Sequence, residues 1–166
     1  MLNESAPIGS TDEPIDLYGF TGRWLALAHT AMRAEFARRL SAAGGSLPTW
    51  QVLRAVEAAG APTQIELTRT IGITGATLVR HLDRMSSAGL IERDHEVADR
   101  RVRRVRITDA GRDLLRRLSA VATNEERAVA ALLSEEELVA LRHALHTIAD
   151  HFGAADAHVH ALHAVS

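Results

Sequence analysis

The segment from residue 63 to residue 108 constrains the fold of this chain more than any other stretch. Thr63 opens a helical pattern with Glu66 three residues later, which is the spacing of a capping box, and Gly72 closes it. Thr74 is suited to cap a second helix. Two short helices separated by a glycine turn predict a helix-turn-helix.

Each of the two helices has an expected inner and outer side, because steps of three and four residues place side chains on one helical face. We expect inward positions for Ile65, Leu67 and Ile71 in the first helix, and for Leu78, Val79, Leu82 and Met85 in the second. The expected outward residues of the second helix are Ala76, Thr77, Arg80 and Arg84, with His81 at their edge.

An arginine-rich hairpin is predicted to follow the two helices. Residues 90–94 and 102–107 have the pattern of strands, and Asp99 lies near the turn that connects them. The hairpin therefore resembles a β-wing beside the helix-turn-helix. Five arginines fall within seven residues, with no acid among them: Arg100, Arg101, Arg103, Arg104 and Arg106.

Apolar helices are predicted on both sides of this segment. One spans about residues 15–40, one starts near residue 108 with Leu114, Leu115, Leu118 and Val121 inward, and a last one starts at Ser134 and carries Leu138, Leu141, Leu145, Ile148 and Phe152. These helices are too apolar to stand alone, so we expect them to form a dimerisation platform. The expected fold class is mainly α with a small β-wing.

The charge distribution separates the middle of the chain from its ends. Residues 23–123 carry 17 arginines against ten acids, whereas residues 1–22 carry four acids and no base, and residues 124–166 carry seven acids and two arginines. A basic centre between acidic ends points to a polyanionic partner for the centre, although the formal net charge of the chain is −2.

Duplex DNA is the partner that this combination favours. A helix can enter the major groove, small residues such as Ala76 let the backbone approach, and Arg80 is placed for a guanine edge. A guanidinium at a hairpin tip fits the minor groove. The predicted DNA-binding residues are Thr74, Ala76, Thr77, Arg80, His81, Arg84, Asp99, Arg100, Arg101 and Arg103.

The segment 47–115 resembles the MarR family of bacterial winged-helix regulators. The resemblance rests on LPTWQVLRAV, on IELTRTIGITGATLVRHLDRMSSAGLIER, on the wing motif DRR and on RITDAGRDLL. The TLVRHLDRM wording is similar to a SlyA-like branch. The resemblance implies a homodimer on a near-palindromic operator, with matches at Thr74, Ala76, Thr77, Arg80, Asp99, Arg100 and Arg101. The wing tip DHEVADRR departs from the family because it lacks a proline.

The resemblance also implies a pocket for a small aromatic or phenolic acid between platform and winged helix. The candidate effector-binding residues are Trp24, His29, Arg33 and Trp50. The alternative interpretation of the two tryptophans is that they are ordinary core residues. The chain has no cysteine, which excludes sensing by thiol oxidation.

Two alternatives to a ligand-responsive repressor follow from other features. His143, His146 and Asp150 have helical metal-ligand spacing near a His-rich tail, which suggests a metal sensor, although no metal site or cofactor is assigned. A non-sensing architectural DNA-binding protein is the other alternative. An enzyme is not expected, because the chain has no phosphate-binding glycine loop and no nucleophile elbow.

The predicted organisation has five regions. They are a disordered arm at 1–14, a dimerisation helix at 15–45, a winged helix-turn-helix DNA-binding domain at 46–108, dimerisation helices at 109–152 and an Ala/His-rich tail at 153–166. No apolar run reaches the ~18 residues that a membrane span needs, and the N-terminus does not resemble a signal peptide. We therefore expect a cytoplasmic homodimeric transcriptional regulator whose partners are double-stranded DNA and a small-molecule effector, with no membrane.

Overall fold

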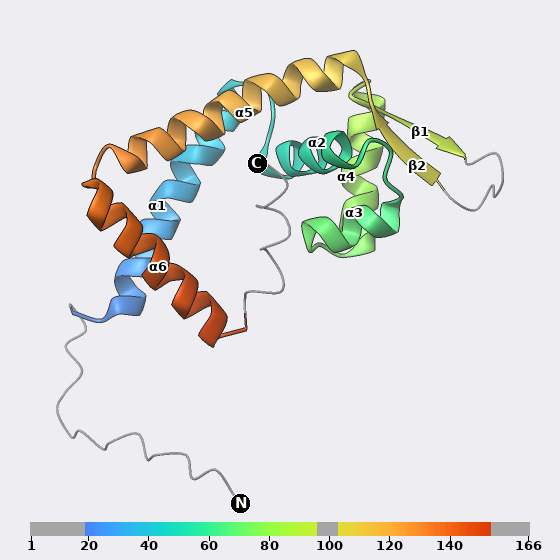
Figure 1. Ribbon diagram of the computed structural model, residues 1–166. Helices are drawn as coiled ribbons and strands as arrows, with labels where there is room; N and C mark the ends of the chain where they lie inside the picture. Colours follow the sequence, from blue (N-terminus) through green and yellow to red (C-terminus); the bar gives the residue numbers. More distant parts are fainter. Residues whose placement is uncertain (1–18, 96–102, 154–166) are drawn as a thin grey trace, which may run out of the picture. The chain divides into compact units, whose positions relative to one another are not determined.

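The computed structural model describes residues 19–95 and 103–153, without the side chains of His95 and Arg103. The elements in these ranges are α1 (Thr21–Ala42), α2 (Leu47–Ala59), α3 (Gln64–Ile71), α4 (Gly75–Ser87), β1 (Ile91–His95), β2 (Arg103–Ile107), α5 (Asp109–Ala130) and α6 (Glu135–His151) (Figure 1). The predicted fold class, mainly α with a two-stranded wing, is confirmed. The chain divides into two compact units between Glu35 and Phe36, so α1 belongs to both.

The helix-turn-helix begins with the predicted capping box. The amide of Thr63 donates to Glu66 Oε2 at 2.7 Å, and the amide of Glu66 donates back to Thr63 Oγ1 at 3.3 Å. These bonds, first the one from the Thr63 backbone and then the one from its hydroxyl, lower the pKa of Glu66. Gly72 ends α3 with a φ of 72°, a left-handed conformation that glycine adopts without steric cost.

The core of the second unit joins α2, α3, α4, the wing and the first half of α5. The buried apolar residues are Leu40, Val52, Leu53, Val56, Leu67, Leu78, Leu82, Met85, Ile91, Val105, Ile107, Leu114 and Leu118. Leu115 and Val121 pack partly buried against this core. The inner face predicted for α5 is thus confirmed, and so are the inward positions of Leu67, Leu78, Leu82 and Met85.

Two residues that were predicted to face inward do not. The Ile65 residue is 65% exposed and Val79 is 38% exposed. Ile65 lies two positions before the buried Leu67, and residues two apart point to opposite sides of a helix. Val79 follows Leu78 by one position, which rotates it to the margin of the apolar side.

The wing is tied to the loop before α3. β1 and β2 pair antiparallel, with Arg93 opposite Val105 and Ile91 opposite Ile107. The amide of Val105 also donates to the carbonyl oxygen of Pro62 at 2.9 Å. An isolated bridge between Thr63 and Arg104 continues this contact. The helix-turn-helix and the wing therefore share backbone hydrogen bonds as well as a core.

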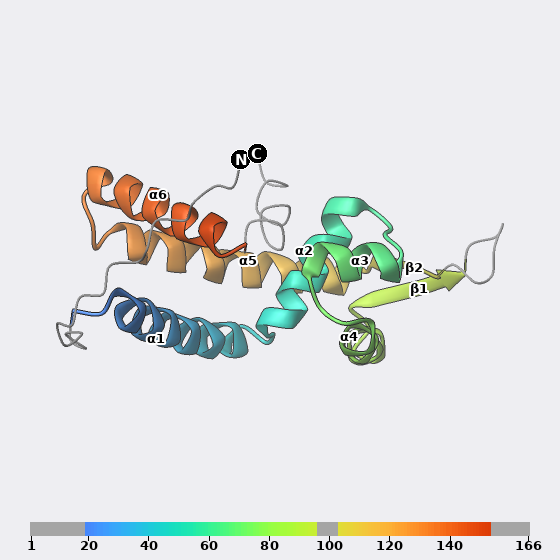
Figure 2. The ribbon, with the colours of Figure 1, turned by 90° about the horizontal axis from the view of Figure 1, so that it is seen from below.

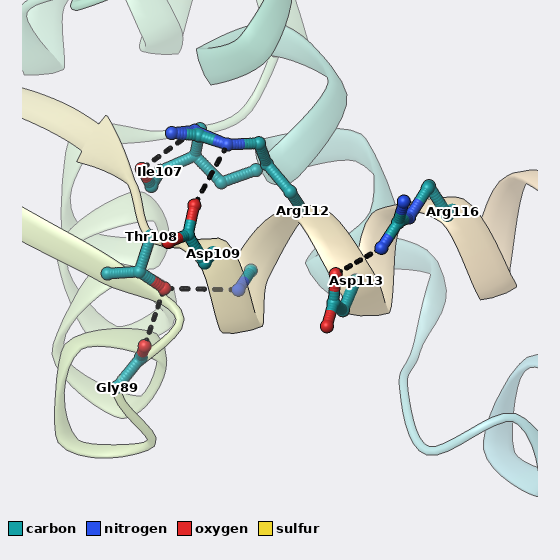
Figure 3. A network of polar contacts seen from close by, with 8 residues as sticks. Gly89, Ile107, Thr108, Asp109, Arg112, Asp113 and Arg116 are labelled. Atoms are coloured by element: carbon teal, nitrogen blue, oxygen red, sulfur yellow. Dashed lines mark hydrogen bonds and ion pairs between the residues drawn. The ribbon is translucent and has the colours of Figure 1, made fainter.

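Thr108 fixes the start of α5 (Figure 3). Its hydroxyl donates to the carbonyl oxygen of Gly89 at 2.7 Å and accepts from the amide of Gly111 at 3.0 Å. Gly111 packs so closely that a Cβ at this position would lie 2.1 Å from the carbonyl oxygen of Leu90. From this junction α5 leads away from the wing, and after Leu133 the chain turns into α6 (Figure 1).

The terminal helices differ from this core in what they expose. In the first unit, Trp24 is 60% exposed and Leu27 is 48% exposed. In the second unit, no residue of α6 is buried, and Leu141 and Leu145 are exposed. The predicted capping box of Ser134 and Glu137 is present and lowers the pKa of Glu137. None of the described helices combines the length and the apolarity that a membrane span requires.

Candidate nucleic-acid interface

The N-terminal end of α4 is small and exposed. Thr74 caps the helix: its hydroxyl accepts from the amide of Thr77 at 3.3 Å and donates to Thr77 Oγ1 at 2.9 Å. Gly75 and Ala76 are exposed, and Thr77 is half-buried rather than fully outward. A helix start of this kind combines free amide donors with a positive dipole end, and so favours a phosphate.

The next turn of α4 presents the basic residues that were predicted to face outward. Arg80 is exposed, and in the described part of the chain it has no acidic partner. Arg84 folds back on its own helix, where Nε donates to the carbonyl oxygen of Arg80 at 3.3 Å and Nη2 lies 3.5 Å from His81 Nδ1. Partial burial, and then the charges of Arg84 and Arg80, lower the pKa of His81. The imidazole is therefore neutral at physiological pH in the free protein.

The described wing arginines bind the protein itself. Arg104 Nη1 donates to the carbonyl oxygen of Ala61 at 3.0 Å, and Arg106 Nε lies 3.4 Å from Asp94 Oδ2 across the hairpin. Arg104 thereby joins the hairpin to the loop before α3, whereas the pair of Arg106 and Asp94 is exposed. Asp99, Arg100 and Arg101 lie outside the described residues, as does the side chain of Arg103.

Sequence reasoning missed one charged pair between α4 and the wing. Arg93 Nη2 of β1 lies 2.8 Å from Asp83 Oδ1 of α4, and the Arg93 side chain is only 14% exposed whereas that of Asp83 is 61% exposed. The available signal was the position of Asp83 three residues after Arg80, on a side that is otherwise basic or small. A lone acid there calls for a counterion.

The candidate effector residues are divided between the two units. Trp24, His29 and Arg33 are exposed on the part of α1 that belongs to the first unit, and Trp50 belongs to the second. Their joint pocket stays a prediction. Trp50 itself is integrated into its unit, in agreement with the alternative interpretation as a core residue: Nε1 donates to Ser119 Oγ at 3.2 Å, and the ring meets Phe36 edge-on at 5.8 Å between centroids.

Two of the three candidate metal ligands on α6, His146 and Asp150, form a pair, and no hydrogen bond or ion pair joins the His143 side chain to them in the described structure. His146 Nδ1 lies 2.8 Å from Asp150 Oδ2, and both side chains are about half exposed or more, at 67% and 46%. Among residues 19–95 and 103–153, no three His, Cys, Asp or Glu side chains gather as metal ligands would. The tail histidines lie outside these ranges.

Comparison with known proteins agrees with this geometry. Residues 44–102 match the model of the MarR family. The crystal structure of a probable transcriptional regulator from Pseudomonas aeruginosa is 30% identical, covers 80% of this chain and 98% of its own, and superimposes with a TM-score of 0.68. This chain belongs to the MarR family. MarR-family proteins are DNA-binding transcriptional regulators. The winged helix described above is therefore the DNA-binding fold of this chain.

Two further MarR-like structures have the same fold at lower identity. Bordetella bronchiseptica BpsR, studied for the regulation of its DNA binding by 6-hydroxynicotinic acid, is 24% identical, with 83% of this chain and 99% of that chain covered and a TM-score of 0.71. A mutant MarR from E. coli in complex with operator DNA is 22% identical, with 76% and 91% covered and a TM-score of 0.68. Placement in a SlyA-like branch of the family stays a prediction.

Proposed function

We propose that this MarR-family regulator is a homodimeric, ligand-responsive repressor that binds a near-palindromic operator and releases it when a small aromatic or phenolic anion binds. The outward side of α4 carries the proposal. Arg80 is exposed without an acidic partner in the described chain, and the small, capped helix start lies one turn before it. A helix of this kind is suited to the major groove, where arginine forms a forked contact with guanine.

The wing completes the proposed interface. β2 shares hydrogen bonds with the loop before α3, so the hairpin is held in a fixed relation to the helix-turn-helix. Arg103 is the first residue of β2, and Arg100 and Arg101 precede it in the sequence. We assign these three arginines to the minor groove and its phosphates. Asp99 would orient one of these guanidinium groups by a forked ion pair.

The effector part of the proposal rests on the exposed α1 residues and on a relative. BpsR is regulated by 6-hydroxynicotinic acid, a hydroxylated aromatic acid. Trp24 offers an exposed aromatic surface, and Arg33 offers a cation for a carboxylate or phenolate. A dimer whose two winged helices are held at a fixed spacing reads both halves of a palindrome. A ligand that changes this spacing then dissociates the dimer from the operator.

Operator selection from random DNA with purified full-length protein tests the proposal, followed by band-shift titration. A two-fold symmetric site, with half-sites about one helical turn apart, is expected. Arg80→Ala should weaken operator binding by ~1–3 kcal/mol and relax base preference at its contact. Arg127→Ala, which removes an exposed arginine near the C-terminal end of α5, is the matched control and should bind normally.

Three outcomes would contradict parts of the proposal. Normal operator binding by Arg80→Ala would mean that α4 is not the recognition helix. Binding without sequence preference and with a steep salt slope would indicate an architectural protein. If micromolar Zn²⁺ or Ni²⁺ changes operator affinity and a panel of hydroxylated aromatic acids does not, the effector is a metal rather than an aromatic anion.

A further inference from the structure

Asp83 occupies the side of α4 that faces away from the core. It follows Arg80 by three residues and Ala76 by seven, so the three side chains share one helical face. The Asp83 side chain is 61% exposed. An acid on this face is unexpected, because each phosphate of a bound duplex would repel it. Its presence requires either a counterion or a contact that the carboxylate itself makes.

Arg93 on β1 supplies the counterion of Asp83. Its side chain is only 14% exposed and its Nη2 lies 2.8 Å from Asp83 Oδ1. The Nε and Nη2 atoms are buried and make no hydrogen bond within the described structure, so charge is what holds this guanidinium to the carboxylate. Arg93 stands on β1 opposite the buried Val105. A guanidinium anchored in this way fixes the direction of the carboxylate and offsets its charge.

A carboxylate can only accept hydrogen bonds. In the major groove the acceptors of guanine repel it, whereas cytosine presents its N4 amino group as a donor. We propose that Asp83 is a specificity-determining residue that accepts a hydrogen bond from the N4 amino group of a cytosine in each operator half-site, with Arg93 as its positioning residue. This inference rests on the proposed function, since it requires α4 in the major groove.

The test compares base preference, position by position, for Asp83→Asn, Asp83→Ala and the unchanged protein. Asparagine has nearly the same shape but pairs with adenine, so Asp83→Asn should move the preference at one position of each half-site from cytosine to adenine. Asp83→Ala should lose about 5- to 100-fold discrimination at that position and leave the other positions unchanged. Circular dichroism and thermal unfolding confirm that each variant is folded.

Glu92→Gln is the matched control. Glu92 is exposed on β1 next to Arg93, and its substitution removes the same charge from the same neighbourhood. It should strengthen binding to all sequences alike without altering base preference. If Asp83→Asn behaves in the same way as Glu92→Gln, the carboxylate acts only through its charge and the inference is overturned.

Arg93→Met separates positioning from packing. If Arg93 acts through Asp83, discrimination at the cytosine position falls in Arg93→Met, and adding Asp83→Ala lowers it no further. Additive losses at that position would overturn the positioning role. Arg80→Ala distinguishes the two levels of failure: if it loses operator affinity while the Asp83 variants keep their base preference, this inference fails and the proposed function stands.

Discussion

The Thr108 hydroxyl contacts two elements at once. It caps α5, and it donates to the carbonyl oxygen of Gly89 in the turn that follows α4. We expect Thr108→Val to lower the free energy of unfolding by ~1–3 kcal/mol, since it removes a helix cap and leaves a carbonyl without its donor. Thr108→Ser keeps both hydrogen bonds and should therefore lower the free energy of unfolding by much less than Thr108→Val does. Urea unfolding followed by circular dichroism measures both; equal losses in the two variants would show that the methyl group, not the hydroxyl, matters.

We expect His81 to link operator binding to pH. Partial burial, and then the positive charges of Arg84 and Arg80, hold its pKa below the ordinary value of 6.5, so the free protein carries a neutral ring. A DNA phosphate nearby favours the charged ring, and the complex should therefore take up a proton. We expect operator affinity to rise as pH falls from 8 towards 6, by at most about tenfold per pH unit for each His81.

The free protein should respond to pH with the opposite sign. Its unfolded chain binds the His81 proton more readily than the folded chain does, so this residue removes stability as pH falls below about 6.5. Band shifts and thermal unfolding across the same pH range test both directions, with constant salt. His81→Gln should flatten the affinity profile. A profile that stays steep in this variant would assign the titration to another group.

At the scale of elements, the contact between β2 and the loop before α3 is what unites wing and helix-turn-helix. We expect Arg104→Ala to lower stability by about 1–2 kcal/mol, because it removes a partly buried, charge-assisted hydrogen bond to Ala61. The Val105 amide, which donates to Pro62, should then exchange its hydrogen faster. Arg106→Ala removes an exposed ion pair instead and should have little effect on stability, so equal losses in the two variants would contradict this assignment.

Most elements of the winged helix were predictable from short-range rules. Caps such as Thr63 and Thr74 and terminators such as Gly72 act within four residues, and α3 and α4 start where these residues place them. The inward positions of Leu78, Leu82 and Met85 also followed from their spacing, whereas Ile65 and Val79 are exposed although their apolar character predicted them inward.

What was not predictable depends on contacts distant in sequence. Arg104 had the pattern of a free wing arginine, yet it reaches Ala61, 43 residues away. The pair of Asp83 and Arg93 required knowledge of how β1 lies against α4. Figure 2 shows α4 nearly along its axis beside β1, an arrangement that no local pattern contains. For the site, the sequence therefore identified the outward face of α4 and could not tell which of the wing arginines bind the protein itself.

At the scale of the whole molecule, α6 and its C-cap expose apolar side chains that no described part of the chain covers. Leu141 and Leu145 are exposed at 39% and 41%, and Phe152 at 78%. Single apolar residues on a surface are ordinary, but Leu141 and Leu145 share one face of a helix that has no buried residue, and Phe152 follows as its C-cap; together they favour a partner. A second copy of the chain is the partner that the proposed palindromic operator requires.

We therefore expect Leu145→Asp to shift the protein from dimer to monomer in light scattering at micromolar concentration. A carboxylate in an apolar interface is left without hydrogen bonds, and one appears on each side of a two-fold contact. Ala140→Asp is the control, because Ala140 is exposed on α6 and lies off the face that Leu141 and Leu145 share. Operator affinity should fall in Leu145→Asp towards that of an isolated half-site, whereas Ala140→Asp should keep dimer and operator binding. A Leu145→Asp protein that remains dimeric would place the contact between copies on other residues, and a monomer that binds the full operator normally would remove the need for the dimer altogether.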